Sequence, residues 1–262
     1  MYLPVAGAPE DEVERRQMRA TYYGAQREVD DQLVRLFDYL DRSGLASSTL
    51  VVLTSDHGEM GGDHWLFEKL GYWDESFHVP LIVVDPDPAA DPVRGRVVGA
   101  FTESVDVLPT ICRWLDIEIP LQADGFPLQP FLRAEGADAD GTPEHWRREA
   151  HWSWNFSDPV SRAAEQLFGI PMAHCALDVV RGDDLKYVQF AAAADHLPPL
   201  LFDLAADPDQ LEDLVPSGGA SELGWLASRR LHQWRMRNDE RTLSGTMLTD
   251  ARGEVSFRDE WR

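Results

Sequence analysis

Cysteine and long apolar runs are scarce in this chain, and each scarcity argues against a class of protein. Only two cysteines occur among the 262 residues, Cys112 and Cys175, so the sequence argues against a disulfide framework while leaving a single bridge open. No run approaches the roughly 18 consecutive apolar residues that a membrane-spanning helix needs. The N-terminus lacks a basic segment followed by an apolar one and does not resemble a secretory signal, so the predicted location is cytoplasmic.

Positive charge is the second scarcity. Lys and Arg number 24 against 46 for Asp and Glu, which gives a formal net charge of −22 at pH 7. Such a field repels nucleic acid and anionic membranes, so neither is a predicted partner, although the acidity also suits a simple role in solubility. Lysine is rarer still, because Lys69 and Lys186 are the only two. Because the chain otherwise uses arginine, its two lysines suggest that a compact ammonium is needed at these positions.

The first part of the chain alternates helical and strand patterns. Apolar residues fall at helical spacing from about Glu10 to Leu40, which predicts an amphipathic helix that covers another element and stops near Gly44. Continuous apolar runs at 49–54 and 79–84 predict strands buried on both faces of a parallel sheet. A second helix is predicted from Ser104, its N-cap, to Leu115. Alternation of helix and buried strand indicates an α/β layer.

The later part of the chain has a different texture and suggests a smaller unit. Residues 176–190 predict two strands around a Gly-Asp-Asp turn, 199–204 predict a third, and 222–237 predict a helix, so a small antiparallel sheet with one helix is expected. The length suits one domain with a smaller appendage. We divide the chain into an α/β part at 1–132, a linker at 133–150, and a small α+β subdomain with a C-terminal arm at 151–262.

The stretch from Thr54 to Lys69 holds two histidines, four acidic residues and a lysine directly after the first predicted strand. Asp56 and His57 therefore sit just outside the carboxyl end of a strand, where open α/β sheets bind ligands, and Gly58 permits the backbone to turn there. A carboxylate beside an imidazole suits Mn²⁺ or Zn²⁺ better than Ca²⁺, which prefers oxygen ligands. Two ligands are too few for a metal, so others must come from elsewhere. A helix cap with a hydrogen-bonded histidine is the simpler alternative.

Several segments, in order and spacing, resemble the sulfatase branch of the alkaline phosphatase superfamily. They are Y-Y-G-A-Q-R-E-V-D-D-Q-L at 22–33, T-L-V-V-L-T-S-D-H-G-E-M-G-G-D-H-W-L-F-E-K at 49–69, E-S-F-H-V-P-L-I-V at 75–83, S-V-D-V-L-P-T at 104–110, D-L-K-Y-V at 184–188 and L-F-D-L-A-A-D-P at 201–208. Within that branch the phosphonate monoester hydrolase and arylsulfatase subgroup is the most similar. This similarity rests on W-R-R-E-A-H-W at 146–152, Y-V-Q-F at 187–190, P-P-L-L-F-D-L at 198–204 and R-M-R-N-D-E-R-T-L at 235–243.

The resemblance implies a fold and a set of site residues. The fold is part of an alkaline-phosphatase-like doubly wound mixed sheet, with a smaller C-terminal antiparallel sheet and a helix. Asp56 and His57 match the second half of the family's site for one divalent metal ion, whose identity stays open among Mn²⁺, Zn²⁺, Ca²⁺ and Mg²⁺. Lys69 matches the catalytic lysine that holds the anionic oxygens of the substrate. His64, in the G-D-H triplet, is assigned to substrate binding, by a supporting hydrogen bond rather than by reacting itself.

The resemblance also implies a reaction, and one part of it is missing. In the family a formylglycine hydrate, made from Cys or Ser, attacks sulfur or phosphorus while a metal polarises the ester. The family motif is Cys or Ser, any residue, Pro or Ala, any residue, then Arg, and neither Cys112 nor Cys175 fits it. We therefore expect the C-terminal half of a hydrolase of small anionic sulfate, phosphate or phosphonate esters, with no nucleophile in this chain. The C-terminal arm of the subgroup suggests a homo-oligomer.

Other candidate residues have structural interpretations. Asp30 and Asp31 are expected on the solvated face of a helix. Aromatic side chains near 154 are expected to pack the small sheet, rather than to line a pocket. Scattered histidines without metal-ligand spacing are expected to be structural, and Lys186 to be architectural. The aromatic residues are Trp152, Trp154 and Phe156, and the histidines are His151, His174 and His196.

Three functional hypotheses follow from the sequence. The first is the metal-dependent hydrolase described above. The second is a non-catalytic fragment or pseudoenzyme that acts as a folded interaction module, and the third is an unrelated binder of small ligands at the same sheet edge. Metal binding with turnover would favour the first, and affinity without turnover the third. Loss of a central strand would expose apolar edge surface, so aggregation is a further prediction.

Overall fold

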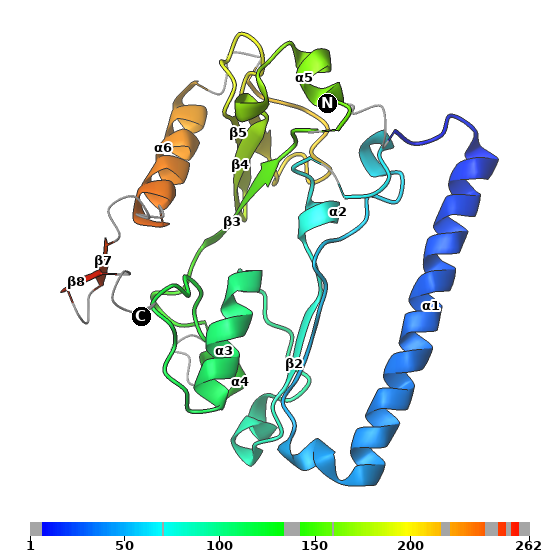
Figure 1. Ribbon diagram of the computed structural model, residues 1–262, viewed down its shortest axis with the longest axis vertical. Coiled ribbons are helices and arrows are strands. Elements are labelled where there is room, and N and C mark those ends of the chain that lie inside the picture. Colours follow the sequence, from blue (N-terminus) through cyan, green and yellow to red (C-terminus); the bar gives the residue numbers. More distant parts are fainter. Residues whose placement is uncertain are drawn as a thin grey trace.

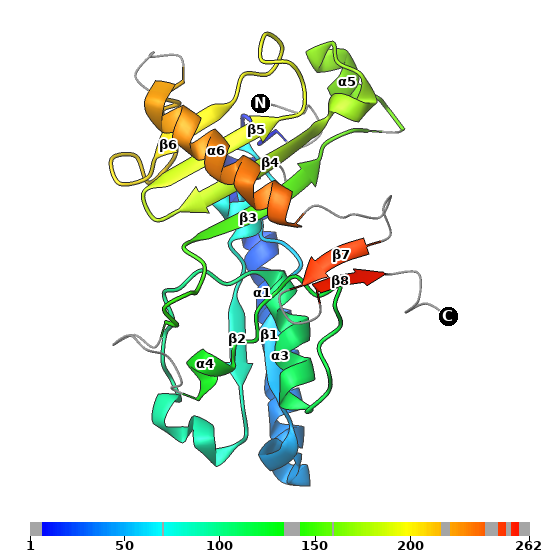
Figure 2. The ribbon, with the colours of Figure 1, turned by 90° about the vertical axis from the view of Figure 1, so that its left-hand side faces the viewer.

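The computed structural model describes residues 7–69, 71–133, 142–158, 160–215, 221–238, 246–249 and 253–256. Figures 1 and 2 show two parts, one above the other: the strands at 51–54 and 81–84 with the helices at 107–114 and 129–132 lie below, and a small sheet with the helices at 163–168 and 221–238 lies above. The long helix at 12–43 runs along one side of the molecule. None of the helices in these ranges is long and apolar enough to cross a bilayer. Short helices connect the main elements: η1 (Leu45–Ser48), η2 (Asp63–Trp65), α2 (Asp74–Phe77), η3 (Pro88–Val93), α4 (Gln129–Leu132), α5 (Ala163–Phe168) and η5 (Met172–His174).

The helix α1 (Glu12–Ser43) has clear start and stop signals. The carboxylate of Asp11 accepts the backbone N–H of Val13 at 2.6 Å, and Gly44, with φ of 74°, takes the left-handed conformation that ends the helix. This confirms the predicted stop. The prediction that its apolar side covers another element is wrong for the described residues, because none of the α1 side chains is buried. Val29, for example, is 58% exposed.

The strands β1 (Val51–Thr54) and β2 (Leu81–Val84) pair antiparallel, with Thr54 opposite Leu81. The prediction of parallel strands at this place is wrong, because an apolar run carries no information on the direction of the neighbouring strand. The prediction that both faces of these strands are buried is also wrong. Leu81 and Val83 pack against the apolar cluster around Phe131, while Ile82 is 54% exposed on the other face.

The helix α3 (Val107–Trp114) follows one turn of 3₁₀ helix, η4 (Ser104–Asp106). Figures 1 and 2 show the β1–β2 pair between α1 on one side and α3 with α4 on the other, an α/β layering. The predicted N-cap at Ser104 is wrong. The N-cap is Glu103, one residue earlier, in a capping box: its side chain accepts the backbone N–H of Asp106, and the buried carboxylate of Asp106 accepts the backbone N–H of Glu103 at 2.8 Å in return.

The upper part is a four-stranded antiparallel sheet in the order β3-β4-β5-β6, as its sequence pattern predicts for the last three strands. Its strands are β3 (Glu149–Asn155), β4 (Ala176–Gly182), β5 (Leu185–Phe190) and β6 (Leu200–Asp203). One face packs on a core that contains Val179, Val188 and Phe202. The other face packs on α6 (Ser221–Asn238), which crosses the sheet in Figure 2. The strands β7 (Thr246–Thr249) and β8 (Gly253–Ser256) form a separate antiparallel pair.

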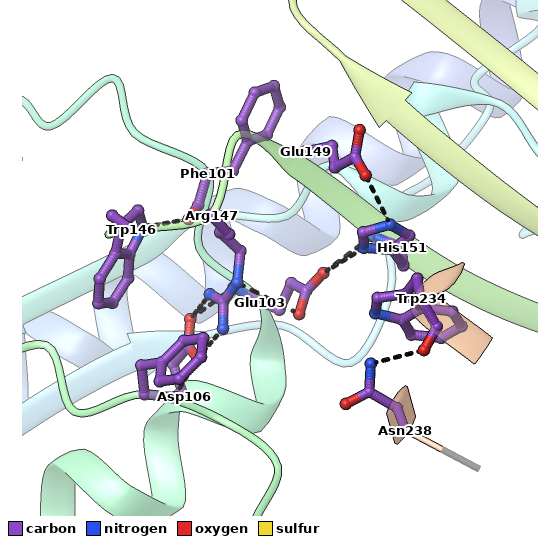
Figure 3. A network of polar contacts seen from close by, with 10 residues as sticks. Phe101, Glu103, Asp106, Trp146, Arg147, Glu149, His151, Trp234 and Asn238 are labelled. Atoms are coloured by element: carbon purple, nitrogen blue, oxygen red, sulfur yellow. Dashed lines mark hydrogen bonds and ion pairs between the residues drawn. The ribbon is translucent and has the colours of Figure 1, made fainter. Parts of the chain in front are cut away.

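A network of charged side chains joins the two parts (Figure 3). Arg147, just before β3, makes a bidentate pair with Asp106 and lies 3.6 Å from Glu103. His151 of β3 lies between Glu103, at 3.6 Å, and Glu149, at 3.4 Å, and its ring stacks on Trp234 of α6. The strand β3 therefore begins at Glu149, inside the predicted linker, whose residues 134–141 lie outside the described ranges.

Candidate functional site

The connection from β1 to β2 carries every residue that the sequence assigns to the site. It leaves the strand after Thr54 and is held by Gly58, whose N–H donates to the carbonyl of Ser76 at 2.8 Å. A Cβ at Gly58 would lie 1.9 Å from the carbonyl oxygen of Glu75. The glycine is therefore needed for close approach of two backbone segments, whereas the sequence suggested a turn.

Asp56, His57 and Lys69 lie together. The Nδ1–H of His57 donates to the carbonyl of Gly58 at 2.7 Å, and this assigns the tautomer whose Nε2 is free to accept. That Nε2 lies 2.9 Å from the Lys69 ammonium and 3.6 Å from Asp56 Oδ2. The structure thus brings the two predicted metal ligands and the predicted anion-binding lysine into one cluster.

The cluster faces solvent and favours a charged carboxylate. The side chain of Asp56 is 84% exposed and that of His57 is 36% exposed. Desolvation raises the pKa of Asp56, but the His57 imidazole, backbone N–H groups and Lys69 outweigh it, so the pKa lies below the ordinary value. Asp56 is therefore ionised at neutral pH and is ready to bind a cation.

His64 lies in η2 and contacts different residues. Its ring stacks on Trp73, with centroids 3.6 Å apart and planes 8° apart, and its Nε2 is 4.0 Å from Glu75 Oε1. Its φ of 48° is in the left-handed region, which is strained for a residue with a Cβ. Burial lowers the pKa of His64 against the opposing effect of Glu75, so the ring is neutral at neutral pH. These contacts are a ring stack and an ion-pair separation, so the predicted supporting hydrogen bond and the role in substrate binding stay predictions.

Sequence reasoning missed the residues that hold this arrangement, Trp73 to Ser76. The matched segment that begins at Glu75 is a sequence signal for Glu75 and Ser76, whereas no pattern marked Trp73 and Asp74. Asp74, the first residue of α2, accepts hydrogen bonds from Lys186 at 2.8 Å and Arg181 at 3.1 Å. The site is therefore supported from the small sheet, which lies far away in sequence.

The donor set fits two positions of a metal site. A histidine that donates one ring nitrogen to a backbone carbonyl and presents the other for a metal is the usual arrangement of a histidine ligand, and in His57 that second nitrogen faces the Lys69 ammonium. With Asp56 and His57 the donors are one carboxylate and one imidazole, a mixture that suits Mn²⁺ or Zn²⁺. The described residues contain no group of three or more histidine, cysteine or acidic side chains placed to hold an ion. Asp56 and His57 therefore need further ligands, as the sequence predicts.

The two cysteines are packing residues. Cys112 of α3 and Cys175, which precedes β4, are both buried and unbridged, and this settles the disulfide question left open by the sequence. Burial raises the pKa of the Cys175 thiol, so it stays protonated.

Most other candidates have the structural positions predicted for them. Trp152 stacks on Phe77, and Trp154 packs against the core of the small sheet. Asp31 pairs with Arg27 at 2.8 Å on the exposed surface of α1. His196 pairs with the exposed Asp195. None of these four contacts involves Asp56, His57 or Lys69.

A cavity of about 670 Å³ lies between the first half of α1 and the loop that carries the cluster. Tyr22 and Arg19 line it from the helix, and Met60 and Phe67 line it from the loop. Its walls thus combine aromatic and apolar groups with one arginine and three carboxylates, those of Glu59, Asp63 and Glu68.

Comparisons with known proteins agree with this geometry. Residues 5–117 match the family model described as Sulfatase, and residues 62–237 match the one described as N-sulphoglucosamine sulphohydrolase, C-terminal. The chain is 41% identical over 239 residues to the multifunctional alkaline phosphatase superfamily protein PehA of Trinickia caryophylli, across 91% of this chain and 44% of that protein.

Two solved structures are similar over nearly the whole chain. The phosphonate monoester hydrolase of Agrobacterium radiobacter superposes with a TM-score of 0.79 at 39% identity, across 93% of this chain and 46% of that one. The phosphonate monoester hydrolase SpPMH of Silicibacter pomeroyi has a TM-score of 0.81 at 33% identity, across 95% and 46%. The chain spans less than half the length of each relative.

Proposed function

Because the chain belongs to the sulfatase family, we propose that it contributes two metal ligands and an anion-binding lysine to a metal-dependent hydrolase of sulfate, phosphate or phosphonate esters. Its α/β fold is that of the phosphonate monoester hydrolases, as the sequence predicts. The observation that carries the proposal is that the Lys69 ammonium and Asp56 Oδ2 both lie close to Nε2 of His57, at 2.9 Å and 3.6 Å.

Each residue has a distinct role in this proposal. Asp56 and His57 would hold the divalent ion, and the Gly58 carbonyl, which accepts from Nδ1–H, leaves Nε2 of the imidazole as the nitrogen that would bind it. The ion, when bound, supplies Lewis acidity toward the ester oxygens. Lys69 donates from its ammonium to an anionic oxygen of the substrate and stabilises the charge that develops there. This local positive charge explains how an acidic protein binds an anion.

The nucleophile is proposed to lie outside this chain. Cys112 and Cys175 are buried among packing residues, and neither sequence context fits the family motif. The reaction therefore needs a residue that the described part does not supply.

Phosphonate and phosphate esters are the first substrates to test. Two of the similar structures are named phosphonate monoester hydrolases, at 39% and 33% identity. Sulfate esters come next, because an arylsulfatase K of Xenopus laevis is 31% identical over 79% of this chain and 35% of that protein.

A chimera tests the proposal. The chain replaces the matching share of the Agrobacterium radiobacter enzyme, and hydrolysis of an aryl phosphonate monoester and of an aryl sulfate is measured with Mn²⁺. We expect turnover of at least one substrate. Lys69→Ala should lower kcat/KM by about 10²–10³-fold, since one preorganised donor to the developing charge is lost. Asp56→Asn and His57→Ala should lower both metal content and activity.

The matched control is His196→Ala, which removes an exposed histidine that also has a carboxylate neighbour. It should leave activity unchanged. A folded chimera whose activity is indifferent to Lys69→Ala would contradict the assigned site. A folded chimera that neither binds metal nor turns over either substrate would instead favour the alternative of a non-catalytic interaction module.

A further inference from the structure

Lys186 is one of only two lysines, and it is fully buried, with 0% of its side chain exposed. It lies on β5, and its ammonium donates to Asp74 Oδ1 at 2.8 Å and to the side-chain oxygen of Gln210. The same ammonium lies over the rings of Trp152, at 5.3 Å, and Trp73, at 5.7 Å. Lys186 thus belongs to the small sheet and contacts the connection that carries the site.

Stability alone is a weak explanation for this lysine. Burying a charge is costly, and a buried ion pair can often be replaced by apolar residues of similar volume without loss of stability. Burial accordingly lowers the pKa of Lys186, while Asp74 opposes the shift. Desolvation likewise raises the pKa of Asp74, but Lys186 and Arg181 outweigh it and hold that pKa low, so the carboxylate is charged.

Asp74 belongs to a short segment, residues 73–76, that contacts the site connection at two places, Gly58 and His64. Trp73 stacks on His64, and the Ser76 carbonyl accepts the N–H of Gly58. The backbone of Glu75 lies so close to Gly58 that no side chain fits between them. In addition, Glu75 Oε2 is buried without a hydrogen-bond partner among the described residues.

This segment needs external support. The helix α2 is a single turn of four residues, which has little stability of its own. Lys186 and Arg181 hold it through Asp74, across 112 and 107 positions of sequence. A shift of α2 would move Gly58, and Gly58 carries the carbonyl that orients the His57 ring.

We propose that Lys186 is a positioning residue: by holding Asp74 it seats residues 73–76, against which Gly58 and His64 pack, and so sets the direction of the His57 ring. The inference rests on the proposed function in one respect only, that His57 binds a metal ion. The small sheet is then part of the site machinery, and Lys186 is more than the architectural residue that the sequence suggests.

The experiment compares Lys186→Met, which keeps the length and removes the charge, with Arg147→Met. Arg147 is a matched control because it makes a buried pair with Asp106 at the junction of the two parts, and none of its described contacts is with residues 73–76. The imidazole signals of the histidine-labelled full chain are recorded by NMR, together with line broadening by added Mn²⁺.

In Lys186→Met we expect His64 to lose the ring-current shift from Trp73, and His57 to shift as well. The Mn²⁺ concentration that half-broadens His57 should rise about 10–100-fold, the usual effect of losing a residue that supports a metal ligand. Arg147→Met should lower the thermal midpoint but leave these signals in place. A Lys186→Met protein that is less stable but keeps both histidine signals and the Mn²⁺ response would overturn the proposal.

Asp74→Asn tests the same link from the other side and decides the matter if Lys186→Met does not fold. It should change the same two signals, and an Asp74→Asn protein with unchanged His57 and His64 signals contradicts the inference. The proposed function fails separately, if the folded chimera neither binds metal nor turns over either substrate. The histidine shifts report on positioning in either case.

Discussion

At the scale of single residues, Gly58 has the shortest distance from an added Cβ to a neighbouring atom among the described glycines. Gly58→Ala would place a Cβ 1.9 Å from the Glu75 carbonyl oxygen, so two backbone segments must separate. We predict a loss of about 1–3 kcal/mol in the free energy of unfolding, the usual cost of overpacking. Urea denaturation measures it.

Gly24→Ala is the matched control, because Gly24 lies within α1 and a Cβ there meets nothing within 4 Å. Its free energy of unfolding should rise by about 0.5–1 kcal/mol, since alanine favours a helix more than glycine does. Equal effects of the two substitutions would show that Gly58 is not packed as described.

His151 makes stability depend on pH. Desolvation lowers its pKa, but Glu103 and Glu149 outweigh this and raise it above the ordinary value (Figure 3). Arg147 and Arg230 pair with the same carboxylates. Stability from the charged ring is complete below the unfolded pKa of about 6.5 and is lost as pH rises through the higher folded value. The free energy of unfolding should therefore fall as pH rises from about 6.5 through the higher folded pKa of His151.

His151→Gln should remove this fall, as measured by urea denaturation at several pH values. His196→Gln, which changes an exposed histidine beside Asp195, should keep it. At low pH, Glu149 makes stability depend on pH in the opposite direction. The hydrogen bond to His151 is the main cause that lowers the pKa of Glu149, so the stability that its carboxylate contributes is lost as pH falls through the folded pKa.

The residues of the site were only partly predictable. Asp56, His57 and Lys69 lie within one short segment, so local spacing and resemblance find them together. Lys186 and Asp74 are 112 positions apart, and no periodicity links them. Their partnership depends on how the small sheet packs against the connection, which only coordinates show.

At the scale of elements, α1 should be the least protected long element. None of its described side chains is buried, whereas Val179 of β4 and Val188 of β5 are fully buried. Local opening of α1 therefore exposes little new apolar surface. Hydrogen exchange at low protein concentration should be at least about 100-fold faster in α1 than in β4 and β5. Equal protection would mean that something covers the helix.

The sequence predicted an element correctly where its residue pattern fits only one structure. The hairpin of β4 and β5 follows from alternation around a turn, and α1 ends at Gly44 because glycine adopts positive φ easily. The strand direction of β1 and β2 was wrong, because an apolar run fits parallel and antiparallel neighbours equally. The strand β3 was missed since E-A-H-W-S-W-N mixes aromatic and charged residues, and its histidine serves a polar network.

At the scale of the whole molecule, apolar side chains lie exposed on several elements. They include Val29 and Tyr39 on α1, Ile82 on β2 and Leu108 on α3. Such surface favours association, and a net charge of −22 opposes it. We predict that association grows as salt screens the repulsion, measured by light scattering from low to about 0.5 M NaCl. Ile82→Thr should reduce it, and monodisperse monomer at all salt concentrations would contradict the prediction.

The central claim is that Asp56, His57 and Lys69 form one site for a metal and an anion. The most direct measurement is an EPR titration with Mn²⁺ of the chimera described above, in which the Agrobacterium radiobacter part is expected to supply the further ligands, with and without phenylphosphonate. The account predicts binding that Asp56→Asn and His57→Ala weaken at least about 10-fold, and phenylphosphonate should perturb the Mn²⁺ spectrum only when Lys69 is present. Binding that is identical in the Asp56→Asn and His57→Ala proteins, or an anion effect that persists in Lys69→Ala, would contradict it.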